Sequence, residues 1–82
     1  MTEDALENIR GYIRQAFGSM GIVTGEVYLT QSDGPTAVDC HGIDPDDVRK
    51  AAERLQNNLV HDGWRLEAWY DEEAKAVYVD YV

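Results

Sequence analysis

The stretch from Ile43 to Trp64 constrains the fold most, because it combines a helix start, one apolar face and a helix end. Asp44 is a typical N-cap residue, and Pro45 follows at the first helical position, where its missing N–H leaves no hydrogen bond unmade. Gly63 is typical of the position just past a helix end, since glycine adopts the left-handed conformation without strain. These signals predict a helix that begins after Asp44 and ends before Gly63.

This predicted helix has apolar residues at steps of three and four, which places them on one face. They are Val48, Ala51, Ala52, Leu55 and Leu59. Residues 2–19 show a second stripe with the same period, and either Thr2 or Asp4 can cap its start. The members of this second stripe are Leu6, Ile9, Ile13, Ala16 and Phe17. We therefore expect two amphipathic helices, each with one face that another layer must cover.

Apolar and polar residues alternate in four further segments, and this period of two is typical of half-buried strands. The strands are expected at 22–29, 36–41, 64–70 and 77–81, with turns at 32–35 and 71–74. The order helix, strand, strand, helix, strand, strand predicts an α+β fold in which a four-stranded antiparallel sheet carries both helices on one face. At this length we expect a single compact domain over residues 1–82.

The alternation also predicts which residues face the helices and which face outward. The predicted core contains Ile9, Ile13, Phe17, Val27, Leu29, Val48, Leu55, Leu59, Leu66, Val77 and Val79. The open face of the sheet is expected to carry Glu26, Tyr28, Asp39, His41, Glu67, Trp69, Tyr78 and Asp80. Exposed aromatic side chains anchor protein interfaces, and carboxylates beside them would select a basic partner. The alternative is that Trp69 and Tyr78 form a cross-strand pair that only stabilises its hairpin.

The chain has a formal net charge of -9, with 16 acidic residues against 7 basic ones. This charge argues against direct binding to nucleic acid or to an anionic membrane. We expect instead a basic protein surface as partner, such as that of a nucleic-acid-binding protein. The candidate partner-binding residues are Glu26, Tyr28, Asp39, Glu67, Trp69, Asp71, Glu72, Glu73, Tyr78 and Asp80.

The chain contains residue types that occur in catalytic and metal sites, but their positions in the sequence have structural explanations. Cys40 and His41 are consecutive strand residues that point to opposite faces, so they cannot form a thiolate–imidazole pair. There is no CxxC or HxxxH spacing and no glycine-rich phosphate loop, so we expect no metal and no cofactor. The acidic pairs at 46–47 and 71–73 fit helix capping and a solvated turn. We expect a protein that is not an enzyme.

The single cysteine and the lack of an apolar N-terminal run indicate a cytoplasmic protein. In size, acidity and cysteine content the chain is similar in kind to phage-encoded inhibitors of bacterial defence, such as anti-CRISPR and anti-restriction proteins. That likeness implies an inhibitor that occupies a nucleic-acid site with carboxylates. The alternative is a small structural or accessory protein, a homodimer included, whose acidity reflects solubility or a saline cytoplasm.

Overall fold

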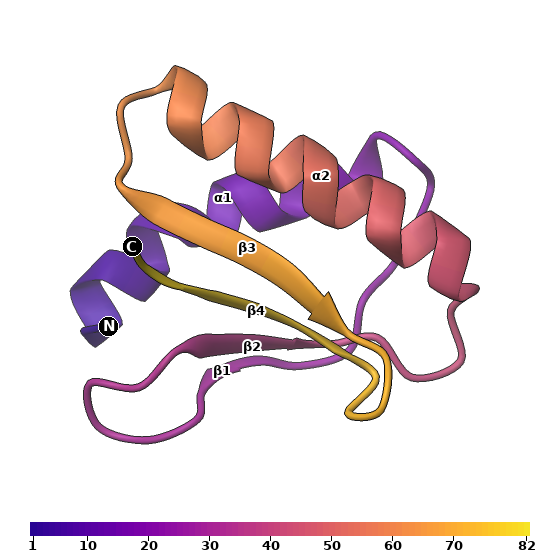
Figure 1. The fold of residues 1–82 in the computed structure, drawn as a ribbon, viewed down its shortest axis with the longest axis horizontal. Coiled ribbons are helices and arrows are strands. Elements are labelled where there is room, and N and C mark those ends of the chain that lie inside the picture. Colours follow the sequence, from indigo (N-terminus) through magenta and orange to yellow (C-terminus); the bar gives the residue numbers. More distant parts are fainter.

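A computed structural model describes residues 1–82 and shows two helices packed on one sheet (Figure 1). The helices are α1 (Glu3–Gly18) and α2 (Pro45–His61), and the strands are β1 (Val27–Leu29), β2 (Thr36–Asp39), β3 (Leu66–Asp71) and β4 (Ala76–Tyr81). The four strands are antiparallel and lie in the order β1-β2-β4-β3. The predicted α+β fold is confirmed, and no helix is long and apolar enough to cross a membrane.

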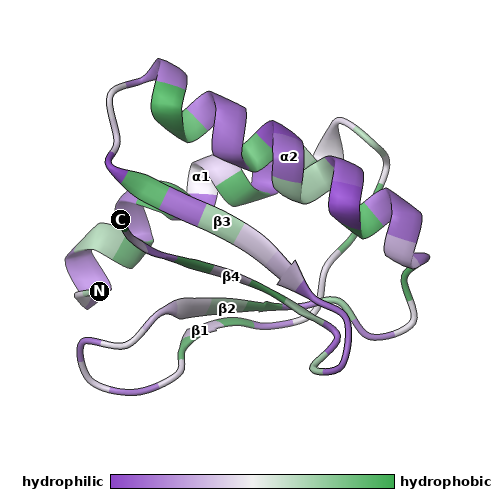
Figure 2. Ribbon diagram, viewed as in Figure 1, coloured by the Kyte–Doolittle hydropathy of each residue, from purple (hydrophilic) through white to green (hydrophobic).

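The helices begin and end where the local sequence signals predict. The Asp44 carboxylate accepts a hydrogen bond from the Asp46 N–H at 2.8 Å, and the Thr2 hydroxyl oxygen accepts one from the Ala5 N–H at 3.2 Å. Gly63 follows the end of α2 with a φ of 86°, in the left-handed region. In Figure 2, hydrophobic and hydrophilic segments alternate along α2, as expected for a helix with one buried face.

The core lies between the helices and the sheet. Its largest fully buried side chains include Phe17 and Ile9 from α1, Leu55 and Leu59 from α2, and Val38, Leu66, Val77 and Val79 from the strands. Val27 and Leu29, which were expected in the core, are only partly buried. They belong to an edge strand, where one flank has no neighbouring strand to cover it.

Strand β1 is shorter than the segment 22–29 that the alternation predicts. The Gly25 N–H donates to the Asp39 carbonyl at 2.9 Å, and the Asp39 N–H donates to the Glu26 carbonyl at 2.9 Å. Two residues thus oppose one, which is the pattern of a β-bulge. A Cβ atom at Gly25 would lie 2.6 Å from Asp39 Oδ2, so a larger residue would have to displace the Asp39 side chain. The bulge ends regular pairing at Val27.

The edge of β3 is closed by a side chain from α2. Gln56 Nε2 donates to the Leu66 carbonyl at 3.0 Å, and Gln56 Oε1 accepts from the Ala68 N–H at 2.6 Å. The carboxamide therefore occupies two backbone groups that would otherwise be available to another strand. An occupied edge is protected from unwanted pairing with other chains.

Candidate protein-binding face

The strand register arranges the open-face residues in three rows that cross the sheet. The central row contains Tyr28, Ala37, Tyr78 and Trp69. One flanking row contains Glu26, Asp39, Ala76 and Asp71, and the other contains Asp80 and Glu67. An aromatic row thus lies between two acidic rows. We call this surface the acidic aromatic face and define it by Glu26, Tyr28, Asp39, Glu67, Trp69, Asp71, Tyr78 and Asp80.

The aromatic row is partly packed and partly exposed. The ring centroids of Trp69 and Tyr78 are 5.8 Å apart with an interplanar angle of 35°, so the two side chains form the cross-strand pair that the sequence allowed. Trp69 still has 39% of its surface exposed, and Tyr28 has 43%. Ala37 lies between the two tyrosines of the row and is fully buried. The row therefore offers flat aromatic surface without a deep cavity.

The acidic rows place like charges directly opposite one another. Glu67 is the register partner of Asp80 on neighbouring strands, and Glu26 is opposite Asp39. Carboxylates in such positions repel each other and destabilise the strand pair. Only the second pair has a basic neighbour, because His41 Nδ1 lies 2.5 Å from Asp39 Oδ1. The hydrogen bonds from the His41 ring and from the His41 N–H hold the pKa of Asp39 below its usual value.

A shallow hollow of about 410 Å³ lies within the acidic aromatic face. It is lined by Glu26, Tyr28, Asp39, His41, Ala74, Ala76 and Tyr78. Two carboxylates and two tyrosine rings meet there, and this combination suits the head group of an arginine or lysine side chain. The carboxylates accept charge-assisted hydrogen bonds, and the ring faces attract a cation.

The acidic turn after β3 is not equally available. Asp71 Oδ1 accepts hydrogen bonds from the backbone N–H groups of Glu73 at 3.0 Å and Ala74 at 3.2 Å, so this carboxylate also holds the turn. Glu72 Oε2 lies 2.7 Å from Arg49 Nη2 on α2, which turns it toward the helices. Glu73 is exposed at the tip of the turn. Two predicted site residues therefore lie outside the acidic aromatic face: Glu72, which pairs with Arg49, and Glu73, at the tip of the turn.

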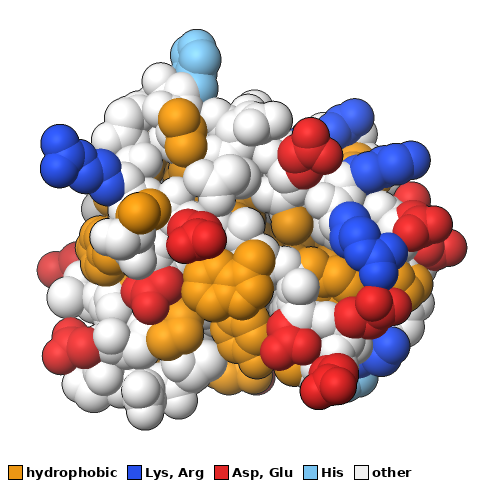
Figure 3. Space-filling model, viewed as in Figure 1, with side chains coloured by type: hydrophobic (Ala, Val, Ile, Leu, Met, Phe, Trp, Pro, Cys, Tyr) orange, Lys and Arg blue, Asp and Glu red, His pale blue; other side chains and the backbone are white.

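Figure 3 shows how charged and hydrophobic side chains are distributed on one side of the molecule. Figure 3 shows a cluster of hydrophobic side chains near the centre of this view, with acidic side chains around it. Basic side chains gather on the right of the view, over the N-terminal part of α2. In this view the acidic side chains are separated by other surface and do not form a continuous band. Spaced carboxylates beside aromatic side chains differ from the closely spaced charges of a phosphate backbone.

Two features of the structure had no signal in the sequence patterns. One is the Gln56 contact with the β3 edge, which depends on the packing of α2 against the sheet. The other is a hollow beside α1 that is bordered by Arg10 and Arg14. A spacing of four residues between two arginines is common on solvated helices, so it does not by itself indicate a site.

Cys40 and His41 lie in different surroundings, one in the core and one on the surface. Cys40 is fully buried, and burial raises the pKa of its thiol to about 11. His41 is exposed, and its ring contacts Asp39 on the open side of the sheet. No group of three His, Cys, Asp or Glu side chains converges with the geometry of a metal site. Comparison with protein-family models, with curated proteins and with solved structures found no match to this chain.

Proposed function

We propose that this chain is a non-enzymatic interaction protein whose acidic aromatic face binds a basic surface on a partner protein. The observation that carries the proposal is the aromatic row between two acidic rows on the sheet face that no helix covers. Arginine and lysine side chains of the partner would stack on Tyr28, Tyr78 and Trp69 and bond to the flanking carboxylates. Partners of this kind include nucleic-acid-binding proteins, because their phosphate sites are rich in arginine and lysine.

The like-charged pairs favour a binding role over simple solubility. A surface that only needs negative charge can place carboxylates apart, where they repel less. Here Glu67 opposes Asp80 on neighbouring strands, and the pair borders the exposed ring of Trp69. A basic partner would relieve this repulsion on binding. The free energy lost in the unbound sheet is then recovered in the complex.

The spacing of the charges bears on the type of partner. Residues on one face of a strand repeat about every 6.6 Å, whereas B-DNA carries one charge per roughly 1.7 Å of its axis. The acidic aromatic face therefore has a lower charge density than nucleic acid, and its aromatic row must contribute to affinity. An inhibitor of the anti-CRISPR or anti-restriction kind could use such a face, with the aromatic side chains as anchors and the carboxylates as selective contacts.

Binding kinetics with a capped arginine-rich peptide as probe would test the proposal. Immobilised wild-type protein is compared with Trp69→Ala, which removes the aromatic anchor but leaves the net charge unchanged. We expect the variant to release the peptide faster, by about fivefold or more, because an anchor lost from a formed contact mainly affects dissociation.

The matched control is Trp64→Phe. Trp64 is partly buried and its ring makes an edge contact with Tyr12 of α1, with centroids 6.4 Å apart, so it lies outside the acidic aromatic face. Its replacement should leave the dissociation rate unchanged. Equal dissociation rates for the wild type and Trp69→Ala, with both proteins folded, would contradict the proposed role of the face.

A further inference from the structure

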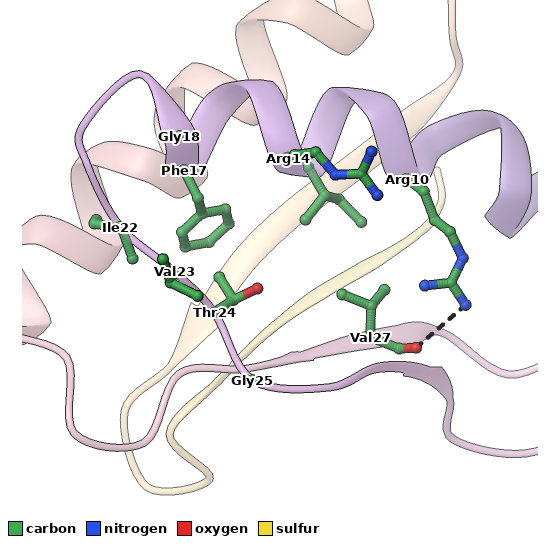
Figure 4. A pocket seen from close by; sticks show the side chains of 10 residues that line it. Arg10, Arg14, Phe17, Gly18, Ile22, Val23, Thr24, Gly25 and Val27 are labelled. Carbon is green, nitrogen blue, oxygen red and sulfur yellow. Dashed lines mark hydrogen bonds between the residues drawn. The ribbon is translucent and has the colours of Figure 1, made fainter.

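A second hollow, of about 430 Å³, lies between α1 and the segment 22–27 (Figure 4). Figure 4 shows Phe17, Ile22 and Val23 at one end of this hollow and Arg10 at the other. Val23 has 90% of its surface exposed, although it is a large apolar residue. The hollow therefore has an apolar end and a basic end, and it borders the edge strand β1.

The basic end contains two arginines one helical turn apart. Arg10 Nε bonds to Glu7 Oε1 at 2.8 Å, and Arg10 Nη2 approaches the Val27 carbonyl at 3.5 Å. Arg14 is exposed, and no carboxylate lies within ion-pair distance of it. In a chain with a net charge of -9, an unpaired guanidinium over an apolar hollow marks a place that attracts an anion.

The edge of β1 next to this hollow has no neighbouring strand. The bonds from the Asp39 N–H to the Glu26 carbonyl and from the Thr30 N–H to the Pro35 carbonyl show that even-numbered residues of this strand pair with β2. The N–H and C=O groups of Val27 and Leu29 consequently point away from β2, and the Val27 carbonyl accepts the long hydrogen bond from Arg10 Nη2. At the opposite edge of the sheet, Gln56 holds two backbone groups of β3 at 3.0 Å and 2.6 Å, whereas Arg10 holds one backbone group of β1 at 3.5 Å.

We propose that this hollow binds an extended acidic peptide that adds to β1 as a fifth strand. One apolar side chain of the peptide would pack near Phe17, and an aspartate or glutamate two residues along would bond to Arg14. The Val27 N–H and the Leu29 N–H and C=O groups would provide the backbone hydrogen bonds. The positive charge of the arginines favours a peptide with an acidic residue. The apolar end of the hollow favours an apolar side chain two residues before that acid.

The dimensions of helix and strand agree with this pattern. Side chains two residues apart on a strand are separated by about 6.6 Å. Along α1, Arg14 and Arg10 lie about 4.5 Å and about 10.5 Å from Phe17, at 1.5 Å per residue. A carboxylate placed two residues after the apolar side chain would therefore lie between the two guanidinium groups.

This site is independent of the acidic aromatic face. By strand alternation, the Glu26 carboxylate points to the side of the sheet opposite to the Val27 side chain that lines the hollow. Failure of one proposal leaves the other intact, because the two use different residues and opposite charges.

An NMR titration with a defined peptide tests the proposal. The probe is a capped nine-residue peptide of threonines with one leucine and, two residues later, one glutamate. We expect saturable shifts at the amides of Val27 and Leu29. Arg14→Glu should weaken binding by about tenfold or more, the effect of replacing a charge-assisted hydrogen bond with repulsion. Arg14→Gln should weaken it less.

Arg65→Glu is the matched control, since Arg65 is exposed, precedes β3 at the far edge of the sheet and gives the same change in charge. This variant should bind within about twofold of the wild type. Replacing the peptide glutamate by glutamine should weaken binding to the wild type but not to Arg14→Glu. The proposal is overturned if no saturable binding occurs, if Arg65→Glu and Arg14→Glu weaken binding equally, or if the shifts map to the acidic aromatic face.

Discussion

Cys40 shows how burial alone determines the behaviour of a residue with reactive potential. Its side chain is fully buried beside the core, and its Sγ donates a weak hydrogen bond to the Val38 carbonyl at 3.4 Å. Burial raises the pKa of the thiol from 9.0 to about 11. The folded state therefore holds this proton more tightly than the unfolded state does, and the thiolate forms mainly after unfolding.

The raised pKa of Cys40 predicts a loss of stability at alkaline pH. The contribution of the thiol to the free energy of unfolding is fully present below about pH 9 and is lost as the pH rises from about 9 to about 11. Urea denaturation at about pH 8 and about pH 10.5 should show a steeper loss for the wild type than for Cys40→Ala, which has no thiol to titrate. Identical losses in the two proteins, or rapid thiol labelling of the native protein at neutral pH, would count against this account.

The sequence predicts the burial or capping role of a residue where that role depends on residues close to it in the chain. The burial of Cys40 follows from its alternation with Asp39 and His41, and the N-cap role of Asp44 follows from its position before Pro45. The ion pair of Glu72 with Arg49 was not predictable, because these residues are distant in the chain and meet only when α2 packs beside the β3–β4 turn.

Helix α2 was predicted almost completely, since its cap, stripe and terminal glycine all lie within one segment. Strand β1 was predicted too long, because neither the bulge at Gly25 and Glu26 nor the edge position can be read from apolar alternation. The contrast has a physical cause. Helix hydrogen bonds join residues four apart, whereas strand hydrogen bonds depend on a partner elsewhere in the chain.

The buried stripe of α2 predicts a large effect of truncation in its centre. Leu55 is fully buried, so Leu55→Ala should lower the free energy of unfolding by about 2–5 kcal/mol, from lost burial and from the cavity left behind. Val60 lies on the same helix with 59% of its surface exposed, and Val60→Ala should change stability by less than about 0.5 kcal/mol. Denaturation in urea measures both, and similar losses would show that the helix does not pack as described.

The Gln56 contact predicts a specific opening of the β3 edge. Gln56→Ala removes both hydrogen bonds to the strand and should cost about 1–3 kcal/mol, whereas Gln56→Glu keeps an acceptor for the Ala68 N–H and should cost less. Hydrogen exchange at the Ala68 amide should accelerate most in Gln56→Ala. Asn57→Ala, which alters an exposed neighbour, is the control. Unchanged exchange at Ala68 in Gln56→Ala would show that the carboxamide does not protect this edge.

At the scale of the whole molecule, the chain has two surfaces of opposite character. The acidic aromatic face lies on the sheet side that the helices leave uncovered, and the hollow beside Arg14 lies between α1 and the edge strand. The sequence predicted the first surface because strand alternation determines both faces of a sheet at once. The second was not predicted, because it requires α1, the loop after it and β1 to come together.

The central claim is that the position of the carboxylates, and not merely their number, determines binding to a basic partner. The most direct measurement is the association rate of an arginine-rich peptide as a function of salt, for two double variants with the same net charge. Glu67→Lys with Asp80→Lys reverses charge on the acidic aromatic face, and Glu3→Lys with Glu53→Lys reverses exposed charge on the helices.

We expect the sheet variant to associate more slowly and with a weaker dependence on salt than the helix variant, because attraction acts within about a Debye length of the contact. Both variants should remain folded by circular dichroism. If the two variants show the same association rate and the same salt dependence, the carboxylates of the sheet are only part of a solvated acidic surface, and the proposed binding role of the acidic aromatic face is wrong.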